Sequence, residues 1–149
     1  MEGCTDMERM VVDASVAVKW FVSERNTDKA LRLKDLYLNG ALELIAPTLI
    51  YYEVANALRF HPYYRLTETE LLNIITVLRD MQMVIEPTAE TWFRAFKTSI
   101  SEGIAVYDAI YIATSLTLDA KLVTGDERLI ERLSEKVKRK VTSLDELNL

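Results

Sequence analysis

The chain has 149 residues, of which 50% are hydrophobic and 28% are charged, and its formal net charge is −5. This length predicts a single domain over residues 1–149, and the composition excludes a disordered chain. No apolar run approaches the ~20 residues of a membrane-spanning helix, and the start of the chain lacks the basic and apolar regions of a signal peptide. We therefore expect a cytoplasmic protein without a membrane partner.

Short apolar runs of β type alternate along the chain with segments whose apolar residues recur at helical spacing. In chain order, we expect a strand at 9–13, helices at 15–21 and 26–40, a strand at 42–47, helices at 48–60 and 67–81, a strand at 83–87, helices at 88–103 and 107–119, a strand at 121–126, a helix at 127–133 and a strand at 137–143. Residues 1–9 are expected to form a loosely ordered extension. The alternation predicts an α/β fold with a parallel sheet and helices on both faces.

Local signals support several of these helix boundaries. Gly40 and Gly103 stand where C-terminal caps of two helices belong. Pro47 suits the first turn of the helix that follows the second strand. Thr67 and Glu70 have the spacing of a capping box, which predicts the start of a helix there.

Two scarce residue types limit the chemistry that the chain can perform. Cys4 is the only cysteine, which excludes an intramolecular disulfide and a cysteine-based zinc cluster. His61 is the only histidine, and we interpret it as a residue of a surface turn rather than a lone general base. The four glycines are too scattered for a dinucleotide-binding or phosphate-binding loop. Catalysis would therefore rest on carboxylates, hydroxyls and amides.

The basic run at 136–140 is the densest positive segment of the chain. We interpret it as a solvated strand edge, with an RNA-contact patch as the alternative. The negative net charge does not by itself indicate nucleic-acid binding. Acids gathered around divalent cations would nevertheless be neutralised locally, so this charge excludes little.

Two acids follow predicted strands at their carboxyl ends. Asp13 follows the apolar run at 10–12 and stands at the carboxyl end of the first strand, and Asp126 closes the fourth. Parallel sheets bind ligands at this edge, where successive connections diverge to opposite faces. Aspartate is also a favoured helix N-cap, and either residue taken alone fits that structural role.

Two further acids lie inside helical patterns among apolar neighbours. Glu53 lies on or beside the apolar face of its helix, and Asn56 lies on the same side three residues later. Asp108 lies among alanines, isoleucines and tyrosines. A carboxylate in such surroundings needs a cation, hydrogen bonds or a raised pKa, because burial without them is costly. A buried salt bridge to an arginine is the structural alternative for both acids.

Four acids at these places can converge on one pocket, where they would repel one another without cations between them. Oxygen-only ligands favour Mg²⁺ or Mn²⁺ over zinc or copper. The reaction that fits such a site is metal-assisted hydrolysis of a phosphodiester.

Four fragments follow one another along the chain: VVDASV, PTLIYYEVANAL, YDAIYIATSL and LVTGDERL. Together they resemble the PIN-domain family, and in particular the VapC toxins of bacterial and archaeal toxin–antitoxin pairs. The resemblance runs from about residue 10 to about residue 143. It implies a PIN-like three-layer α/β/α sandwich with a central parallel sheet. It also implies an endoribonuclease that depends on Mg²⁺ or Mn²⁺.

The resemblance further implies which residues form the site and what binds to it. The catalytic and metal-binding acids would be Asp13, Glu53, Asp108 and Asp126. The supporting polar residues would be Ser15, Asn56 and Thr124. The implied partners are an RNA substrate, a small VapB-like antitoxin and a second copy of the chain in a homodimer.

Two other functions stay open from the sequence. A haloacid-dehalogenase-like phosphatase also places a nucleophilic aspartate after its first strand, but it would need a second acid at the position of Ser15. A PIN-like module that binds partners without cutting RNA is the second alternative. The presence of all four acids argues against it.

Overall fold

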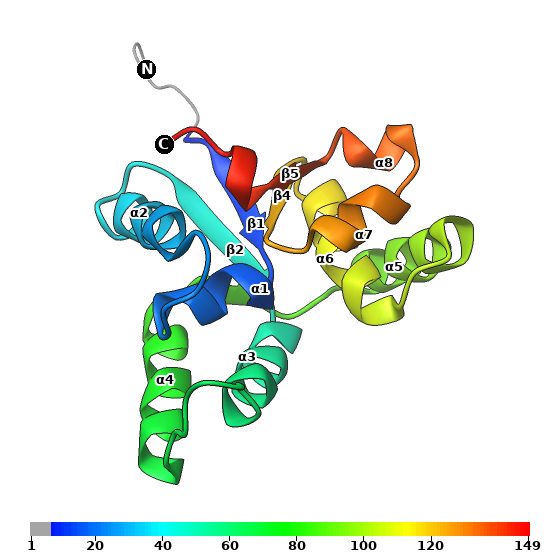
Figure 1. Cartoon of the computed structure of the whole chain (residues 1–149). Helices are drawn as coiled ribbons and strands as arrows, with labels where there is room; N and C mark the ends of the chain where they lie inside the picture. Colours follow the sequence, from blue (N-terminus) through cyan, green and yellow to red (C-terminus); the bar gives the residue numbers. More distant parts are fainter. Residues whose placement is uncertain (1–6) are drawn as a thin grey trace.

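The computed structural model describes residues 7–149 and contains a five-stranded sheet with flanking helices (Figure 1). The strands are β1 (Arg9–Val12), β2 (Glu43–Pro47), β3 (Val84–Ile85), β4 (Lys121–Thr124) and β5 (Val141–Ser143). The α-helices are α1 (Ala14–Ala17), α2 (Thr27–Leu38), α3 (Leu49–Arg59), α4 (Glu68–Asp80), α5 (Ala89–Glu102), α6 (Val106–Thr117), α7 (Glu127–Arg132) and α8 (Glu135–Lys138). The 3₁₀ helices are η1 (Val18–Trp20) and η2 (Leu144–Glu146).

The five strands are all parallel, in the order β3-β2-β1-β4-β5. Strand β1 is central, and its Val11 pairs with Ile45 of β2 on one side and Leu122 of β4 on the other. Parallel neighbours need long crossovers, and helices between the strands supply them. The predicted parallel sheet is thus confirmed.

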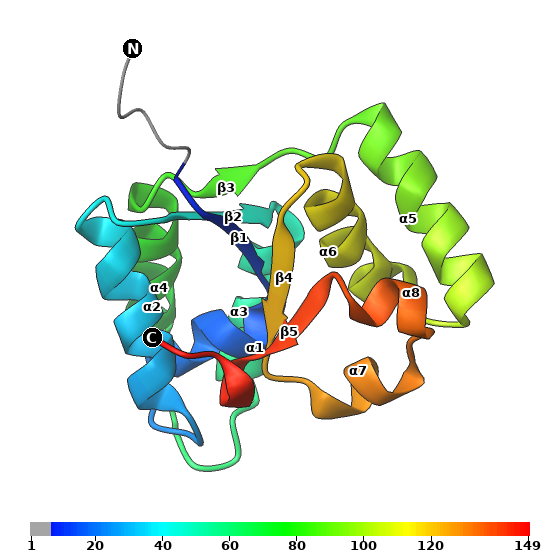
Figure 2. The ribbon, with the colours of Figure 1, turned by 90° about the horizontal axis from the view of Figure 1, so that it is seen from above.

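Helices cover both faces of this sheet. Figure 2 shows α2 on one side, with α5 and α6 on the other. This layering confirms the predicted three-layer α/β/α sandwich. Within residues 7–149, every helix is too short or too polar to cross a lipid bilayer.

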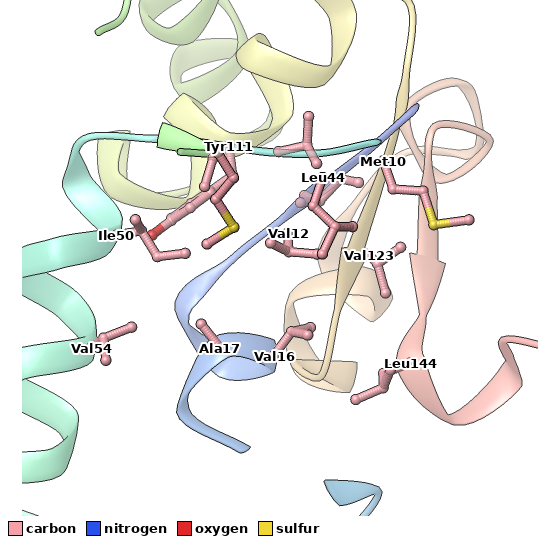
Figure 3. Packing of buried hydrophobic residues seen from close by; sticks show 14 of the residues in the cluster. Met10, Val12, Val16, Ala17, Leu44, Ile50, Val54, Tyr111, Val123 and Leu144 are labelled. Carbon is pink, nitrogen blue, oxygen red and sulfur yellow. The ribbon is translucent and has the colours of Figure 1, made fainter. Parts of the chain in front are cut away.

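The core lies against the central strands. Val11 and Val12, which follow one another in β1, are both fully buried, as is Leu122 in β4. Consecutive buried residues are expected where helices cover both faces of a sheet, because successive side chains point to opposite faces. Figure 3 shows Val12 and Leu44 packed in this core, with Val16 of α1 nearby. The core therefore fixes the carboxyl ends of the strands, where the acids lie.

Local signals in the sequence are confirmed at two helix ends. The Thr67 hydroxyl accepts a hydrogen bond from the Glu70 amide, and the Glu70 carboxylate accepts one from the Thr67 amide, which completes the capping box. Gly103 ends α5 with a φ of 66°, a left-handed conformation that side chains with a Cβ disfavour.

The structure differs from several of the expected element boundaries. Pro47 is the last residue of β2 rather than part of the first turn of α3, which begins at Leu49. The strand expected at 137–143 is wrong in its first half, since 135–138 form α8 and only Val141–Ser143 pair with β4. The basic run at 136–140 therefore lies on a helix and the turn after it, so its interpretation as a strand edge is also wrong. Of the expected extension at 1–9, residues 1–6 lie outside the described residues, and Arg9 already belongs to β1.

The fully buried Leu122 of β4 allows a direct test of this core. We expect Leu122→Ala to lower the free energy of unfolding by about 2–5 kcal/mol, because it opens a cavity under the sheet. Urea denaturation followed by circular dichroism measures this change. Leu72→Ala is the matched control, since Leu72 of α4 is 65% exposed; equal losses in the two variants would contradict the assigned core.

Candidate active site

Asp13 is the first residue after β1 and is buried, with 8% of the residue exposed. Its Oδ1 accepts hydrogen bonds from the Ser15 hydroxyl at 2.5 Å and from the Val16 amide at 3.3 Å. Its Oδ2 accepts one from the Thr124 hydroxyl at 2.5 Å. Asp13 is thus the N-cap of α1, yet each oxygen can accept further bonds, so capping does not exclude metal binding.

The end of β4 is fastened to Asp13 through small polar residues. The Gly125 amide donates a hydrogen bond to the Ser15 hydroxyl at 2.7 Å, and the Asp126 amide donates one to the Thr124 hydroxyl at 3.0 Å. A Cβ on Gly125 would lie 3.3 Å from that Ser15 oxygen, so a larger residue would strain this contact. Ser15 and Thr124 therefore join the two strand ends and orient the Asp13 carboxylate.

Asp126 lies at the matching end of β4 and is exposed. It caps α7, since its Oδ1 accepts a hydrogen bond from the Leu129 amide at 3.1 Å. The structure thus confirms that both strand-end acids are helix caps and places both at the same edge of the sheet.

Glu53 of α3 faces α6 across the site. Its Oε1 accepts a hydrogen bond from the Tyr111 hydroxyl at 2.7 Å, and that tyrosine is only 3% exposed. From the sequence, Tyr111 is only one of the tyrosines around Asp108 and is not predicted to belong to the site. Its position three residues after Asp108 on one helix is the signal that could have placed it in the site.

Asp108 lies in the first turn of α6 and is partly buried. No ion pair within residues 7–149 joins Glu53 or Asp108 to an arginine, so the salt-bridge alternative is wrong for the part of the chain that the structure describes. Glu53 has a tyrosine partner instead. Arg132 acts on Asp108 only through its charge nearby.

The four acids line one cavity of about 370 Å³ at the carboxyl edge of the sheet. The other lining residues are Ala14, Ser15, Val18, Glu24, Ala57 and Tyr111. A larger hollow of about 780 Å³ lies by the amino end of β1 and contains none of the predicted acids. The smaller cavity is the candidate active site, because the four predicted acids face it together with the hydroxyls of Ser15 and Tyr111.

Asn56 does not join this cavity. It is exposed on α3, and the neighbouring Ala57 lines the cavity in its place. Its predicted role as a supporting amide therefore stays a prediction.

The interpretation of His61 as a surface-turn residue is wrong. Its side chain is buried, and its Nε2 lies 2.7 Å from Oε2 of Glu24. The other oxygen of Glu24 accepts a hydrogen bond from Lys19 at 3.3 Å. Glu24 also lines the cavity, so this ionic cluster forms one of its walls. No pattern in the sequence pairs residues 24 and 61, because they meet only through the tertiary fold.

Burial raises the pKa of three of the cavity carboxyls. For Asp13, hydrogen bonds from Ser15 and Thr124 oppose the effect of burial on the pKa without cancelling it. The pKa of Glu53 is raised by burial, against the Tyr111 hydrogen bond, and further by the negative charges of Asp13 and Asp108. Burial also raises the pKa of Asp108, helped by the charge of Asp126. Ionised together, these groups repel one another.

This arrangement fits a hard divalent cation. The cavity offers carboxylate and hydroxyl oxygens, which suit Mg²⁺ or Mn²⁺. A bound cation would offset both the burial and the mutual repulsion that raise the carboxyl pKa values. Within the described residues, no three acidic, histidine or cysteine side chains already form a closed metal-binding group. The acids thus line a shared space rather than a finished coordination shell.

The parallel sheet and the acidic cavity at its carboxyl edge define a PIN-like α/β protein. The sequence profile of the PIN domain matches residues 10–136. The chain is 33% identical to Ribonuclease VapC3 of Pyrobaculum aerophilum over 127 residues, which are 83% of this chain and 94% of that protein. The chain therefore belongs to the PIN-domain family, and it is VapC-like within that family.

Solved structures show the same fold at lower sequence identity. PAE2754 from Pyrobaculum aerophilum matches with a TM-score of 0.65 and 18% identity, over 97% of this chain and 89% of that one. VapBC-1 from nontypeable Haemophilus influenzae matches with a TM-score of 0.64 and 16% identity, over 93% and 99% of the two chains. These likenesses confirm the predicted PIN-like fold. Membership of the PIN family also leaves no support for the phosphatase alternative.

The raised pKa of Asp108 predicts how stability depends on pH in the metal-free protein. A carboxyl whose pKa is raised by folding favours the folded state below about pH 4, where free aspartate titrates, and this advantage is lost as pH rises through its folded pKa. Asparagine does not ionise, so an Asp108→Asn variant does not lose stability in this way as the pH rises. We expect the variant to be more stable than the parent at pH 7, with the difference vanishing toward pH 4.

Urea denaturation in EDTA between pH 4 and pH 8 measures this difference. Added Mn²⁺ should stabilise the parent more than the variant at pH 7, because only the parent retains the full set of acids. A variant that is less stable than the parent at every pH would contradict the assigned environment of Asp108.

Proposed function

We propose that the protein is an endoribonuclease that depends on Mg²⁺ or Mn²⁺ and hydrolyses RNA phosphodiester bonds, as the VapC toxin of a VapBC toxin–antitoxin pair. The observation that carries this proposal is the single cavity lined by Asp13, Glu53, Asp108 and Asp126, three of which have raised carboxyl pKa values. The similarity to Ribonuclease VapC3 supports the same reaction. RNA is the substrate, and the cytoplasm is the proposed location.

Each acid has a proposed place in binding the cation. Asp13 and Asp108 would hold the principal divalent ion, Glu53 would share it or orient its water, and Asp126 would assist a second ion. Such ions, when bound, supply an activated water and positive charge for the developing negative charge on the phosphate. The cavity binds the phosphate beside these carboxylates.

The chain's own hydrogen bonds orient these groups. Ser15 and Thr124 fix the two oxygens of Asp13, and Tyr111 fixes one oxygen of Glu53. A carboxylate held by such bonds loses little conformational freedom when it binds a ligand. The predicted supporting roles of Ser15 and Thr124 are therefore to orient Asp13 rather than to bind the metal strongly.

Cleavage of RNA tests this function. Purified protein, free of any antitoxin, should cut single-stranded or structured RNA when Mg²⁺ or Mn²⁺ is added and should stop when EDTA is added. Asp13→Asn should lower the rate by more than about a hundredfold, because changes that only reorient a metal ligand already cost 10–100-fold. Asp80→Asn, on the exposed end of α4, is the matched control and should keep its activity.

A folded wild-type protein that leaves every RNA intact with both metals would contradict the nuclease and favour the binding module. Formation of a phosphorylated aspartate from a small phosphomonoester would instead point to a phosphatase.

Partners of this chain are proposed on two grounds. Similar folds occur in a toxin–antitoxin complex from Klebsiella pneumoniae and in VapBC-1, which supports a small VapB-like antitoxin that covers the cavity. Helix α5 exposes Trp92, Phe96 and Ile100 at successive four-residue steps, and the Trp92 and Phe96 rings lie 5.7 Å apart. An apolar stripe of this kind suits a second copy of the chain, so we propose a homodimer through α5.

Light scattering after size-exclusion chromatography tests the homodimer. The wild-type chain of 17.1 kDa should elute with about twice its monomer mass. Ile100→Lys, at a position that is 84% exposed, should shift the protein to the monomer without unfolding it. Leu38→Lys on α2, at a position that is 60% exposed, should leave the dimer intact; a monomeric wild-type chain would refute this interface.

A further inference from the structure

The α3 face that lines the cavity continues beyond it to an exposed aromatic ring. Glu53 and Ala57 line the cavity, and Phe60 follows at the next position of the same face, since residues four and seven apart are neighbours on a helix. Phe60 is the C-terminal cap of α3 and is 68% exposed. Phe60 does not line the cavity itself but lies about one helical turn beyond Ala57, and we call the segment of residues 59–65 the rim of the cavity.

A cation and a second ring accompany Phe60. The guanidinium of Arg59 lies over the Phe60 ring, 4.6 Å from its centroid. Tyr63, three residues further on, is 87% exposed. Arg65, also exposed, follows in the same segment. This rim thus combines exposed aromatic rings with positive charge, in contrast to the acidic cavity beside it.

The segment that carries these rings is held in place from below. Buried His61 is hydrogen-bonded to Glu24, and its Nδ1 accepts a hydrogen bond from the Tyr63 amide at 3.2 Å. The Tyr64 hydroxyl accepts a hydrogen bond from the Ser23 amide at 3.2 Å, and its ring packs edge-on against His61. The loop after α3 is thus joined to the loop before α2 at the cavity wall. Rings presented on a fixed backbone lose less entropy when a ligand binds.

We propose that Phe60 and Tyr63, with Arg59, form a base-stacking platform for single-stranded RNA at the rim of the active-site cavity. This inference rests on the proposed nuclease function and adds a site of substrate recognition to it. Exposed aromatic rings bind unpaired bases by stacking, and nearby arginines add attraction to the backbone and to the rings. Bases held on the rim would place the adjoining phosphate over the carboxylates of the cavity.

RNA is favoured over a protein partner by the charge of this surface. The apolar stripe on α5 has no cation stacked on its rings among the described residues, whereas the Phe60 ring has Arg59 over it. A polyanion with flat bases complements both the arginines and the rings. An apolar peptide would complement only the rings.

Binding is measured in an Asp108→Asn background, so that the probe is not cut. The probe is a short single-stranded RNA of mixed sequence that contains 2-aminopurine, whose fluorescence falls when the base stacks. Phe60→Ala and Tyr63→Ala should each weaken binding on the order of tenfold and reduce the quenching, since a stacked base contributes ~1–3 kcal/mol. Phe60→Tyr and Tyr63→Phe keep the rings and should bind like the parent.

Leu38→Ala is the control for removing an exposed apolar side chain, and it should not change binding. In the active chain, Tyr63→Ala should lower kcat/KM mainly through a higher KM. Alanine variants that bind the RNA probe as tightly as the parent would overturn the platform. Variants that keep RNA binding and lose only their inhibition by an antitoxin would overturn it too, because the rings would then bind a protein. A wild-type protein that cuts no RNA would overturn the proposed function itself, which separates the two failures.

Discussion

Parallel pairing of β1 with β4, in the register that places Val12 opposite Val123, is the constraint on which the site depends. This register brings the residues after the two strands together, so Thr124 reaches Asp13 across 111 positions of sequence. Because all five strands run the same way, every strand ends at this edge, and the helices that follow enter it with their N-terminal turns. A slip of β1 by one residue would break the hydrogen bond that joins Asp13 to Thr124 and would change the packing partners of Val11 and Val12, which opposes such a slip.

The same arrangement sets the demands of function against those of stability. Carboxylates that share one cavity repel one another, and burial adds to the cost of their charge, as the raised pKa values of Asp13, Glu53 and Asp108 show. Hydroxyl donors on Ser15, Thr124 and Tyr111 offset part of that cost without neutralising the charge. An uncharged partner leaves the carboxylate able to attract a cation, which an arginine would prevent. Hydroxyl partners in place of arginines therefore keep the carboxylates available to bind a cation.

Much of the fold could be predicted from the sequence, because strong local signals determine it. The strands and long helices follow apolar periodicity, and the capping box of α4 depends on two residues three apart. The basic segment shows the limit of this reasoning: β5 contains only Val141–Ser143, because pairing with the short β4 decides where a strand begins. Propensity alone did not distinguish α8 from a strand at that place.

The sequence by itself determined most of the strands and the long helices, because apolar periodicity can be recognised locally. It also singled out Asp13, Asp126, Glu53 and Asp108 as unusual acids, since strand ends and apolar helix faces are local features. Only the tertiary structure decided their partners. Tyr111 meets Glu53, and His61 meets Glu24, through contacts between residues 58 and 37 positions apart. The tertiary structure also leaves Asn56 exposed and directs Ala57, one position later on the helix, to the cavity. Contacts between distant elements depend on how helices pack across the sheet, and no short-range pattern records that packing.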